Sequence, residues 1–73
     1  MKPEYKIIVN IIEEKARVLD VGCDDGTLME SLKKDKNVDA RGIEISKSKV
    51  QTCVSKGLTV IEGKAEFDLK QFP

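Results

Sequence analysis

Residues 17–28, with the sequence RVLDVGCDDGTL, constrain the fold more than any other part of the chain. An apolar run typical of a buried strand ends in a turn bracketed by Gly22 and Gly26, and the turn opens directly into a helical pattern. α/β proteins use this arrangement to hold nucleotide-like ligands, because backbone N–H groups and a helix N-terminus then lie at the carboxyl end of a strand. The segment therefore predicts a ligand-binding α/β fold.

Carboxylates around this turn indicate which ligand it suits. Asp20, Asp24 and Asp25 crowd the place where a dinucleotide would put its pyrophosphate, and carboxylates repel phosphates. S-adenosylmethionine instead offers an ammonium and a sulfonium there, and both are cations. The dinucleotide fingerprint G-x-G-x-x-G lacks its middle glycine here. A calcium loop with Gly26 at its sixth position would begin and end on apolar residues. We therefore expect S-adenosylmethionine as the cofactor and no metal site.

The rest of the chain alternates between helical and extended patterns. Helices are expected over residues 3–15, 27–36 and 46–56, strands over residues 17–21, 38–45 and 58–61, and a short helical turn over residues 67–73. Thr27 and Glu30 have the spacing of a capping box. Strands that alternate with helices form a parallel sheet with right-handed crossovers. We expect an α/β fold with three parallel strands in the order 3-2-1 and the helices on one face.

Three turns then meet at the carboxyl ends of the strands, over residues 22–26, 44–46 and 62–66. Glu44 ends the second strand 22 residues after Gly22, where an acid commonly accepts hydrogen bonds from ribose hydroxyls. A surface acid that closes a strand is the alternative interpretation. The glycines likewise fit a tight turn whatever it binds. The carboxylate of Asp20, near the end of a buried strand, needs donors from the turn backbone or from a cationic ligand.

The composition narrows the possible functions. Thirteen Lys and Arg residues balance thirteen Asp and Glu residues, so no net field favours nucleic acid or an anionic membrane. Histidine, the commonest general base, is absent. We therefore expect Cys23 not to be a nucleophile, and Cys53 to be a small core residue. Both thiols suit a reducing cytoplasm, and the sequence predicts neither a signal peptide nor a membrane span.

Residues 18–26, VLDVGCDDG, resemble motif I of class I S-adenosylmethionine-dependent methyltransferases, whose usual form is hydrophobic-hydrophobic-Asp-hydrophobic-Gly-Cys-Gly-x-Gly. More narrowly, the chain resembles the amino-terminal part of the MetW family of bacterial methionine-biosynthesis proteins. The matching segments are RVLDVGC (17–23), DGTL (25–28), GIEI (42–45), CVSKG (53–57), VIEG (60–63) and FP (72–73). The resemblance implies one partial Rossmann-like domain over residues 1–73, the cofactor-binding half of a methyltransferase fold.

The resemblance also implies a cofactor site, with S-adenosylhomocysteine as the product of methyl transfer. It matches Asp20, Gly22, Cys23 and Gly26 to the cofactor-binding turn and Glu44 to the acid that binds the ribose. We also expect Asp24 in the cofactor-binding turn, and Ile45 and Ala65 near the adenine. Two residues depart from the family pattern. Asp24 replaces the usual second glycine, so its side chain must leave the turn without blocking the methionine moiety. Lys64 stands where a Gly-Asp pair would put an adenine-side acid, and Glu66 is close but not aligned.

Three functions remain open at this stage. The first is an S-adenosylmethionine-binding module of a methyltransferase-like protein, inactive alone because the acceptor-binding elements of family members come after this point. The second is a non-enzymatic partner of a homoserine acetyltransferase, which the family's role in homoserine acylation implies. The third is another nucleotide-binding α/β module. We also expect apolar side chains of all three strands to face water, because no fourth strand covers the apolar edge at residues 18–21 and no second helical layer covers the sheet. The chain should therefore self-associate.

Overall fold

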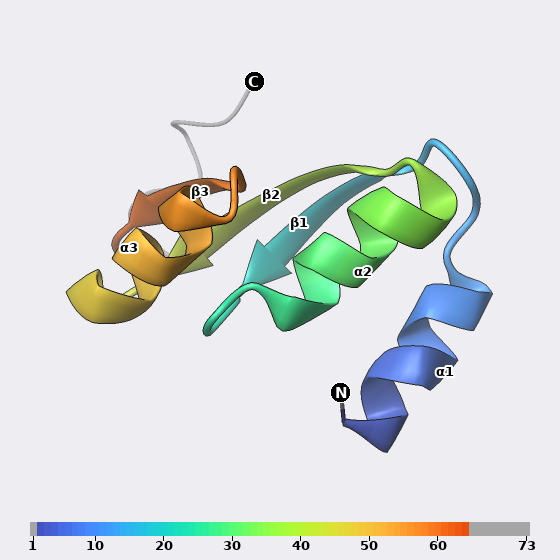
Figure 1. Cartoon of the computed structure of the whole chain (residues 1–73), viewed down its shortest axis with the longest axis horizontal. Helices are drawn as coiled ribbons and strands as arrows, with labels where there is room; N and C mark the ends of the chain where they lie inside the picture. The colour runs from blue at the N-terminus through green and yellow to red at the C-terminus, as the bar shows by residue number, and fades with distance from the viewer. Residues whose placement is uncertain (1, 65–73) are drawn as a thin grey trace.

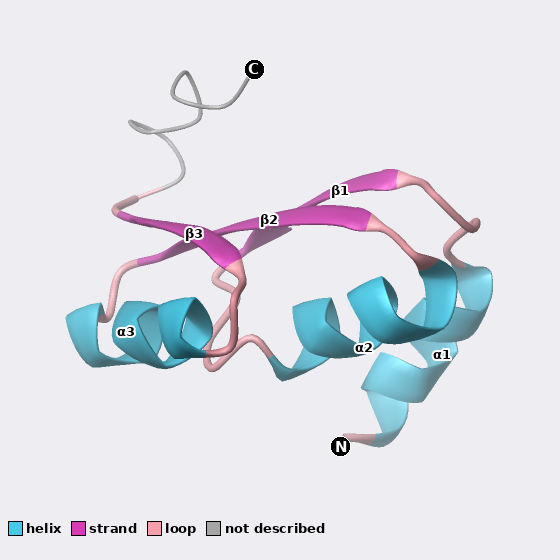
Figure 2. Ribbon diagram, turned by 45° about the horizontal axis from the view of Figure 1, so that its top comes forward, coloured by secondary structure: helices cyan, strands magenta, loops and turns pink. Residues whose placement is uncertain are grey.

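The computed structural model describes residues 2–64, which form a three-stranded sheet with three helices. In chain order the elements are α1 (Pro3–Ile11), β1 (Arg17–Val21), α2 (Thr27–Lys36), β2 (Asp39–Glu44), α3 (Lys47–Ser55) and β3 (Thr59–Glu62). All strand pairs are parallel, and the order β1-β2-β3 confirms the predicted order 3-2-1. The helices lie together on one face of the sheet (Figures 1 and 2), also as predicted.

Helix α1 ends at Ile11, four residues before the predicted end at residue 15. Ile12 is already extended, and Lys15 has a φ of 64° in the turn that leads into β1. Glu13 and Glu14 explain the early end, because carboxylates are unfavourable near the negative end of a helix dipole. The other predicted boundaries agree with the structure to within one residue.

The core lies between the sheet and the helices. Its buried members are Val9, Cys23, Met29, Leu32, Val38, Ala40, Cys53 and Leu58. The central strand contributes a glycine to this core, because a Cβ at Gly42 would lie 2.7 Å from the Cys23 sulfur and 2.9 Å from the Met29 sulfur. Gly42 therefore allows the turn after β1 and the start of α2 to pack directly on β2.

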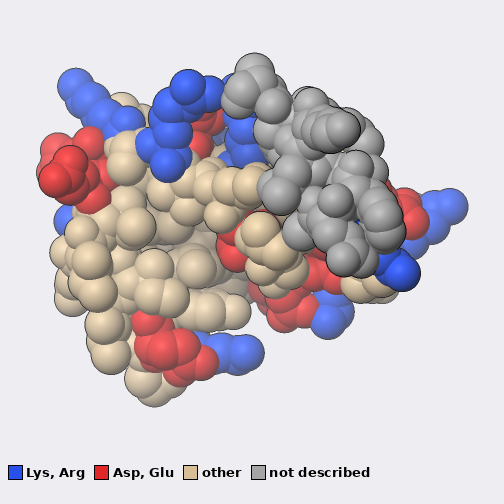
Figure 3. Space-filling view, turned by 180° about the vertical axis from the view of Figure 1, so that it is seen from behind, with Lys and Arg blue, Asp and Glu red and all other residues tan. Residues whose placement is uncertain are grey.

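The opposite face of the sheet is only partly covered. Leu19 is 40% exposed and Val21 is 57% exposed on β1, which lies at the edge of the sheet. Figure 3 shows this side of the molecule, with a broad uncharged area bordered by charged side chains. The expectation that apolar side chains of all three strands face water is wrong for Ile43, which is 1% exposed. Ile43 lies on the central strand, in register between Val21 and Ile61, so neighbouring side chains flank it.

Within residues 2–64, no helix has both the length and the apolar character needed to cross a membrane.

A candidate ligand site at the carboxyl ends of the strands

The turn between β1 and α2 is fixed to the neighbouring strand. The backbone N–H groups of Gly22 and Cys23 both donate to the Ile43 carbonyl, at 2.8 and 3.2 Å, and the Gly26 N–H donates to the Cys23 carbonyl at 3.0 Å. Because these groups are held by β2, the turn keeps one shape at the carboxyl end of the sheet. The predicted strand–turn–helix unit is therefore present.

The two glycines of the turn have different roles. Gly26 has a φ of 82°, and a Cβ there would lie 2.4 Å from Leu58 Cδ1 and 2.9 Å from the Cys53 sulfur. Gly26 is thus required by packing as well as by conformation. Gly22 has a φ of 71°, but a Cβ there would meet nothing within 4 Å. The open space beside Gly22 leaves its backbone accessible to a ligand.

Glu44 joins two of the three predicted turns. Its Oε1 accepts a hydrogen bond from the Asp24 N–H at 2.7 Å, and its Oε2 accepts one from the Ser46 N–H at 2.9 Å. The residue is only 7% exposed. The buried Glu44 carboxylate therefore holds these two turns together. The sequence analysis considered Glu44 as a ribose acceptor or a surface acid and did not anticipate this structural role. Each carboxylate oxygen retains a second lone pair, so a ribose hydroxyl remains a compatible partner.

Asp24 takes a backbone conformation that suits glycine, with a φ of 56°. Its side chain leaves the turn toward α3 and forms an ion pair with Lys49 through Oδ1. The hydrogen-bonded Lys49 ammonium lowers the pKa of the Asp24 carboxyl, and Asp24 in turn raises the pKa of Lys49. The side chain of this non-glycine residue therefore extends from the turn toward Lys49 on α3.

Helix α3 holds the turn through other side chains as well. The Cys53 thiol donates to the Asp24 carbonyl at 3.3 Å, and the Lys56 ammonium donates to the Asp25 carbonyl at 3.0 Å. Ser46 caps this helix by accepting from the Lys49 N–H at 3.4 Å. The position of α3 thus fixes residues 24 and 25 of the turn.

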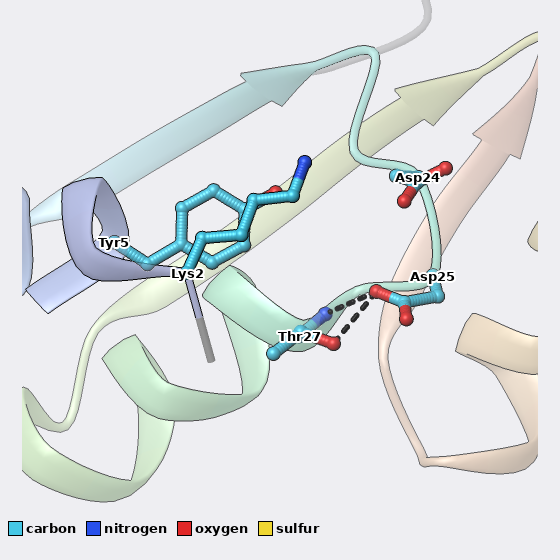
Figure 4. Close-up of a pocket in the computed structure, with 5 residues that line it drawn as sticks. All are labelled: Lys2, Tyr5, Asp24, Asp25 and Thr27. Atoms are coloured by element: carbon cyan, nitrogen blue, oxygen red, sulfur yellow. Dashed lines mark hydrogen bonds between the residues drawn. The ribbon is translucent and has the colours of Figure 1, made fainter.

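The start of α2 differs from the predicted capping box. Gly26, rather than Thr27, is the residue before the first helical residue, and it provides no side-chain cap. The Asp25 carboxylate instead accepts from the Thr27 N–H at 3.0 Å and from the Thr27 hydroxyl at 2.7 Å (Figure 4). These hydrogen bonds lower the pKa of Asp25. An Asp two residues before Thr was the available signal, because Asp side chains commonly hydrogen-bond the backbone two residues on.

The carboxylate of Asp20 accepts no hydrogen bond from the turn. Within residues 2–64 no hydrogen bond to its carboxylate is present, although it is half-buried. Burial first, and then the negative charge of Glu44, raise the pKa of Asp20. Of the two donors considered from the sequence, the turn backbone is engaged elsewhere. A cationic ligand group remains the partner that fits this carboxylate.

Cys23 contributes its backbone to the turn and its side chain to the core. The thiol is buried against Gly42 and is hydrogen-bonded to Cys53. Burial, followed by the effect of Cys53, raises the pKa of Cys23 to about 12. Since the thiolate is the reactive form, a nucleophilic role does not fit this position.

A pocket of about 400 Å³ opens between the start of α1 and this turn. It is lined by Lys2, Tyr5, Asp24, Asp25 and Thr27 (Figure 4). The Lys2 ammonium lies 5.6 Å from the centre of the Tyr5 ring. The sequence analysis assigned no site role to Tyr5 or Lys2, since neither lies near the turn in sequence. The pocket combines a cation, an aromatic ring and two carboxylates.

Two further predicted site residues are Ile45 and Ala65. Ile45 directly follows Glu44 and is 63% exposed, so its side chain is available to a ligand. Ala65 and Glu66, and the helical turn expected over residues 67–73, fall outside the described residues. Within the described part of the chain, no group of three or more potential metal-ligating side chains is present.

Comparisons with known proteins identify the family and the fold of the chain. A family model described as "Methionine biosynthesis protein MetW" matches residues 2–73. No curated protein matches the sequence.

Several solved structures share the fold. A SAM-dependent methyltransferase from Archaeoglobus fulgidus has a TM-score of 0.77 and 26% identity, over 96% of this chain and 31% of that one. A TehB-like SAM-dependent methyltransferase from Corynebacterium glutamicum has a TM-score of 0.76 and 21% identity, over 89% of this chain and 36% of that one. A SAM-dependent methyltransferase from Geobacter sulfurreducens, in complex with S-adenosyl-L-homocysteine, has a TM-score of 0.68 and 24% identity, over 89% and 30%. The chain spans about a third of the length of these structures.

Proposed function

The chain belongs to the MetW family and has a methyltransferase-like fold, and from this premise we propose that it binds S-adenosylmethionine at the turn between β1 and α2. The half-buried carboxylate of Asp20 carries the proposal, because it lies beside Glu44 with no hydrogen bond from residues 2–64. A cationic ligand group would supply the missing partner. The neighbouring turn at Gly22 is open to a ligand, as the absence of atoms around its ideal Cβ position indicates.

The two ends of the cofactor match different parts of the site. The ribose hydroxyls would share the Glu44 carboxylate with the N–H groups of Asp24 and Ser46, and the adenine would lie against the exposed Ile45 side chain. The amino-acid end would occupy the pocket between α1 and the turn. There the Lys2 ammonium suits its carboxylate, and the acids of the turn suit its ammonium.

Isothermal titration of the folded chain with S-adenosylmethionine, S-adenosylhomocysteine and NAD tests this proposal. We expect binding of the first two and none of NAD, whose pyrophosphate would face Asp24 and Asp25. Tighter binding of NAD would instead support a different nucleotide-binding module. Circular dichroism of the same sample establishes that the chain is folded during the titration.

We further propose that the chain acts in methionine biosynthesis in the cytoplasm, as the family description and the two free thiols support. Its methyltransferase activity would depend on the acceptor-binding elements of a full domain. A homoserine acetyltransferase is the partner that the family resemblance suggests. Co-sedimentation of the two proteins tests this, and separate migration at micromolar concentration would count against it.

A second mode of association is favoured by the exposed side chains on β1. Leu19 and Val21 lie on the edge strand, and both are exposed. An apolar edge strand is a template for pairing with another chain. We propose that two copies of the chain associate through this edge and face.

A further inference from the structure

The Asp24–Lys49 ion pair joins the ligand-binding turn to α3 at the wall of the pocket. Asp24 lines the pocket, and its Oδ1 pairs with the Lys49 ammonium from the first turn of α3. Both side chains are about half exposed, so the pair lies at the surface of the site. The Asp24 carboxylate therefore lies at the wall of the pocket, with the Lys49 ammonium next to it.

Lys49 is a cation among several acids. The groups that raise its pKa are Asp24 first, with smaller effects from Glu44 and Asp25. Among the other acids, Asp25 accepts hydrogen bonds from Thr27, and the Lys56 ammonium lies at its backbone carbonyl. Glu44 accepts from two backbone N–H groups, and Asp20 accepts no hydrogen bond within residues 2–64. Within residues 2–64, Lys49 is thus the side chain whose ammonium forms an ion pair with a carboxylate of the turn.

S-adenosylmethionine and S-adenosylhomocysteine differ by one positive charge, at the sulfur atom. A site surrounded by uncompensated acids would favour the sulfonium, and each compensating cation reduces this preference. We propose that the Asp24–Lys49 ion pair determines how strongly the site discriminates between the sulfonium cofactor and its neutral thioether product. The inference rests on the proposed function, because it concerns the charge of that same ligand.

The ratio of the dissociation constants for S-adenosylhomocysteine and S-adenosylmethionine measures this discrimination. Lys49→Gln leaves the Asp24 carboxylate uncompensated and should raise the ratio by about two- to tenfold, the range for one unit charge near a partly exposed site. Asp24→Gly leaves the Lys49 ammonium uncompensated and should lower the ratio by a similar factor. Glycine accepts the left-handed backbone at this position, so this variant keeps the turn.

Two further variants complete the experiment. The double variant Asp24→Gly, Lys49→Gln removes both charges and should return the ratio close to that of the unsubstituted chain. Lys47→Gln removes the same charge from α3, two residues away, at an exposed lysine outside the ion pairs of the described chain. It should leave the ratio unchanged.

The outcomes separate this inference from the proposed function. If the unsubstituted chain binds both ligands but the ratio is the same in Lys49→Gln and Asp24→Gly, the proposed function stands and the role of the ion pair is wrong. A ratio that moves in the same direction in both variants also overturns it. If the folded, unsubstituted chain binds neither ligand, the proposed function fails and this inference falls with it.

Discussion

Glu44 Oε1 accepts a hydrogen bond from the backbone N–H of Asp24 at 2.7 Å, although the two residues lie 20 positions apart. The other oxygen of the same carboxylate accepts from Ser46. A single buried side chain therefore connects the turn after β1 to the turn after β2. Any ligand that uses Glu44 meets a carboxylate already held in place on both sides.

Glu44→Ala tests this double role. Two backbone N–H groups lose their acceptor, so the free energy of unfolding should fall by about 1–3 kcal/mol in urea denaturation. S-adenosylmethionine should bind about 1–3 kcal/mol more weakly in titration, because its ribose hydroxyls lose their hydrogen-bond acceptor. Glu62→Ala is the matched control, because this exposed acid lies in register with Glu44 on β3. Unchanged affinity in Glu44→Ala would remove Glu44 from the ligand site.

Alanine substitutions at the two turn glycines should differ in their effects. Gly26→Ala places a Cβ against Leu58 and Cys53 in a left-handed backbone, and should lower the free energy of unfolding by about 2–5 kcal/mol. Gly22→Ala meets open space and should cost about 1–2 kcal/mol for the backbone alone. It should nevertheless weaken ligand binding. Equal losses of stability in thermal unfolding would contradict the packing role of Gly26.

Asp20 should lower the free energy of unfolding of the chain as the pH rises from acidic values. Its pKa in the folded chain is raised above the ordinary value of 3.8, so the folded state holds this proton more tightly than the unfolded state. This contribution to stability is fully present below pH 3.8 and is lost as the pH rises through the raised pKa. Asp20→Asn should remove this component and raise the free energy of unfolding at pH 7, while it weakens S-adenosylmethionine binding. A less stable Asp20→Asn chain at pH 7 would show that the carboxylate has a structural partner.

Both thiols should be protected in the native chain. Cys23 and Cys53 are buried, and burial is the largest cause of the raised pKa of each. An aromatic disulfide reagent at pH 8 should therefore react with neither thiol until the chain unfolds in urea, where both react at the rate of free cysteine. Rapid labelling of Cys23 in the folded chain would revive a nucleophilic role for it.

Self-association should depend on the outward side chains of β1. Leu19→Lys places a charge on the exposed edge strand and should shift sedimentation at micromolar concentration toward the monomer. Val54→Lys adds the same charge at an exposed apolar position on α3, and should leave the assembly unchanged. A monomer in the unsubstituted chain would contradict association through this edge.

The parts of the structure that follow from local patterns were predictable from the sequence. The strand that ends just before Gly22, the parallel order of the strands and the Ser46 cap each depend on residues that are close in sequence or on general rules of chain connection. The end of α1 at Ile11 was missed because the predicted helix was extended through Glu13 and Glu14, which oppose the helix dipole.

Features of the site that depend on long-range contacts were not predictable. The Asp24 side chain pairs with Lys49. Lys2, the first described residue, lines the same pocket as the residues of the turn. Neither relationship leaves a spacing pattern in the sequence. The family resemblance identified Glu44 as a functional residue, but its two backbone donors depend on how closely the β1 and β2 turns approach.

The two hydrogen bonds from Gly22 and Cys23 to the Ile43 carbonyl also bear on how the chain matures during synthesis. The turn at residues 22–26 leaves the ribosome before the strand that fixes its shape, and Glu44 and Ser46 follow still later. Translation therefore has to pass residue 46 before this turn can take its native form. A nascent chain stalled after residue 36 lacks β2, so we expect it to show none of the full chain's affinity for its ligand.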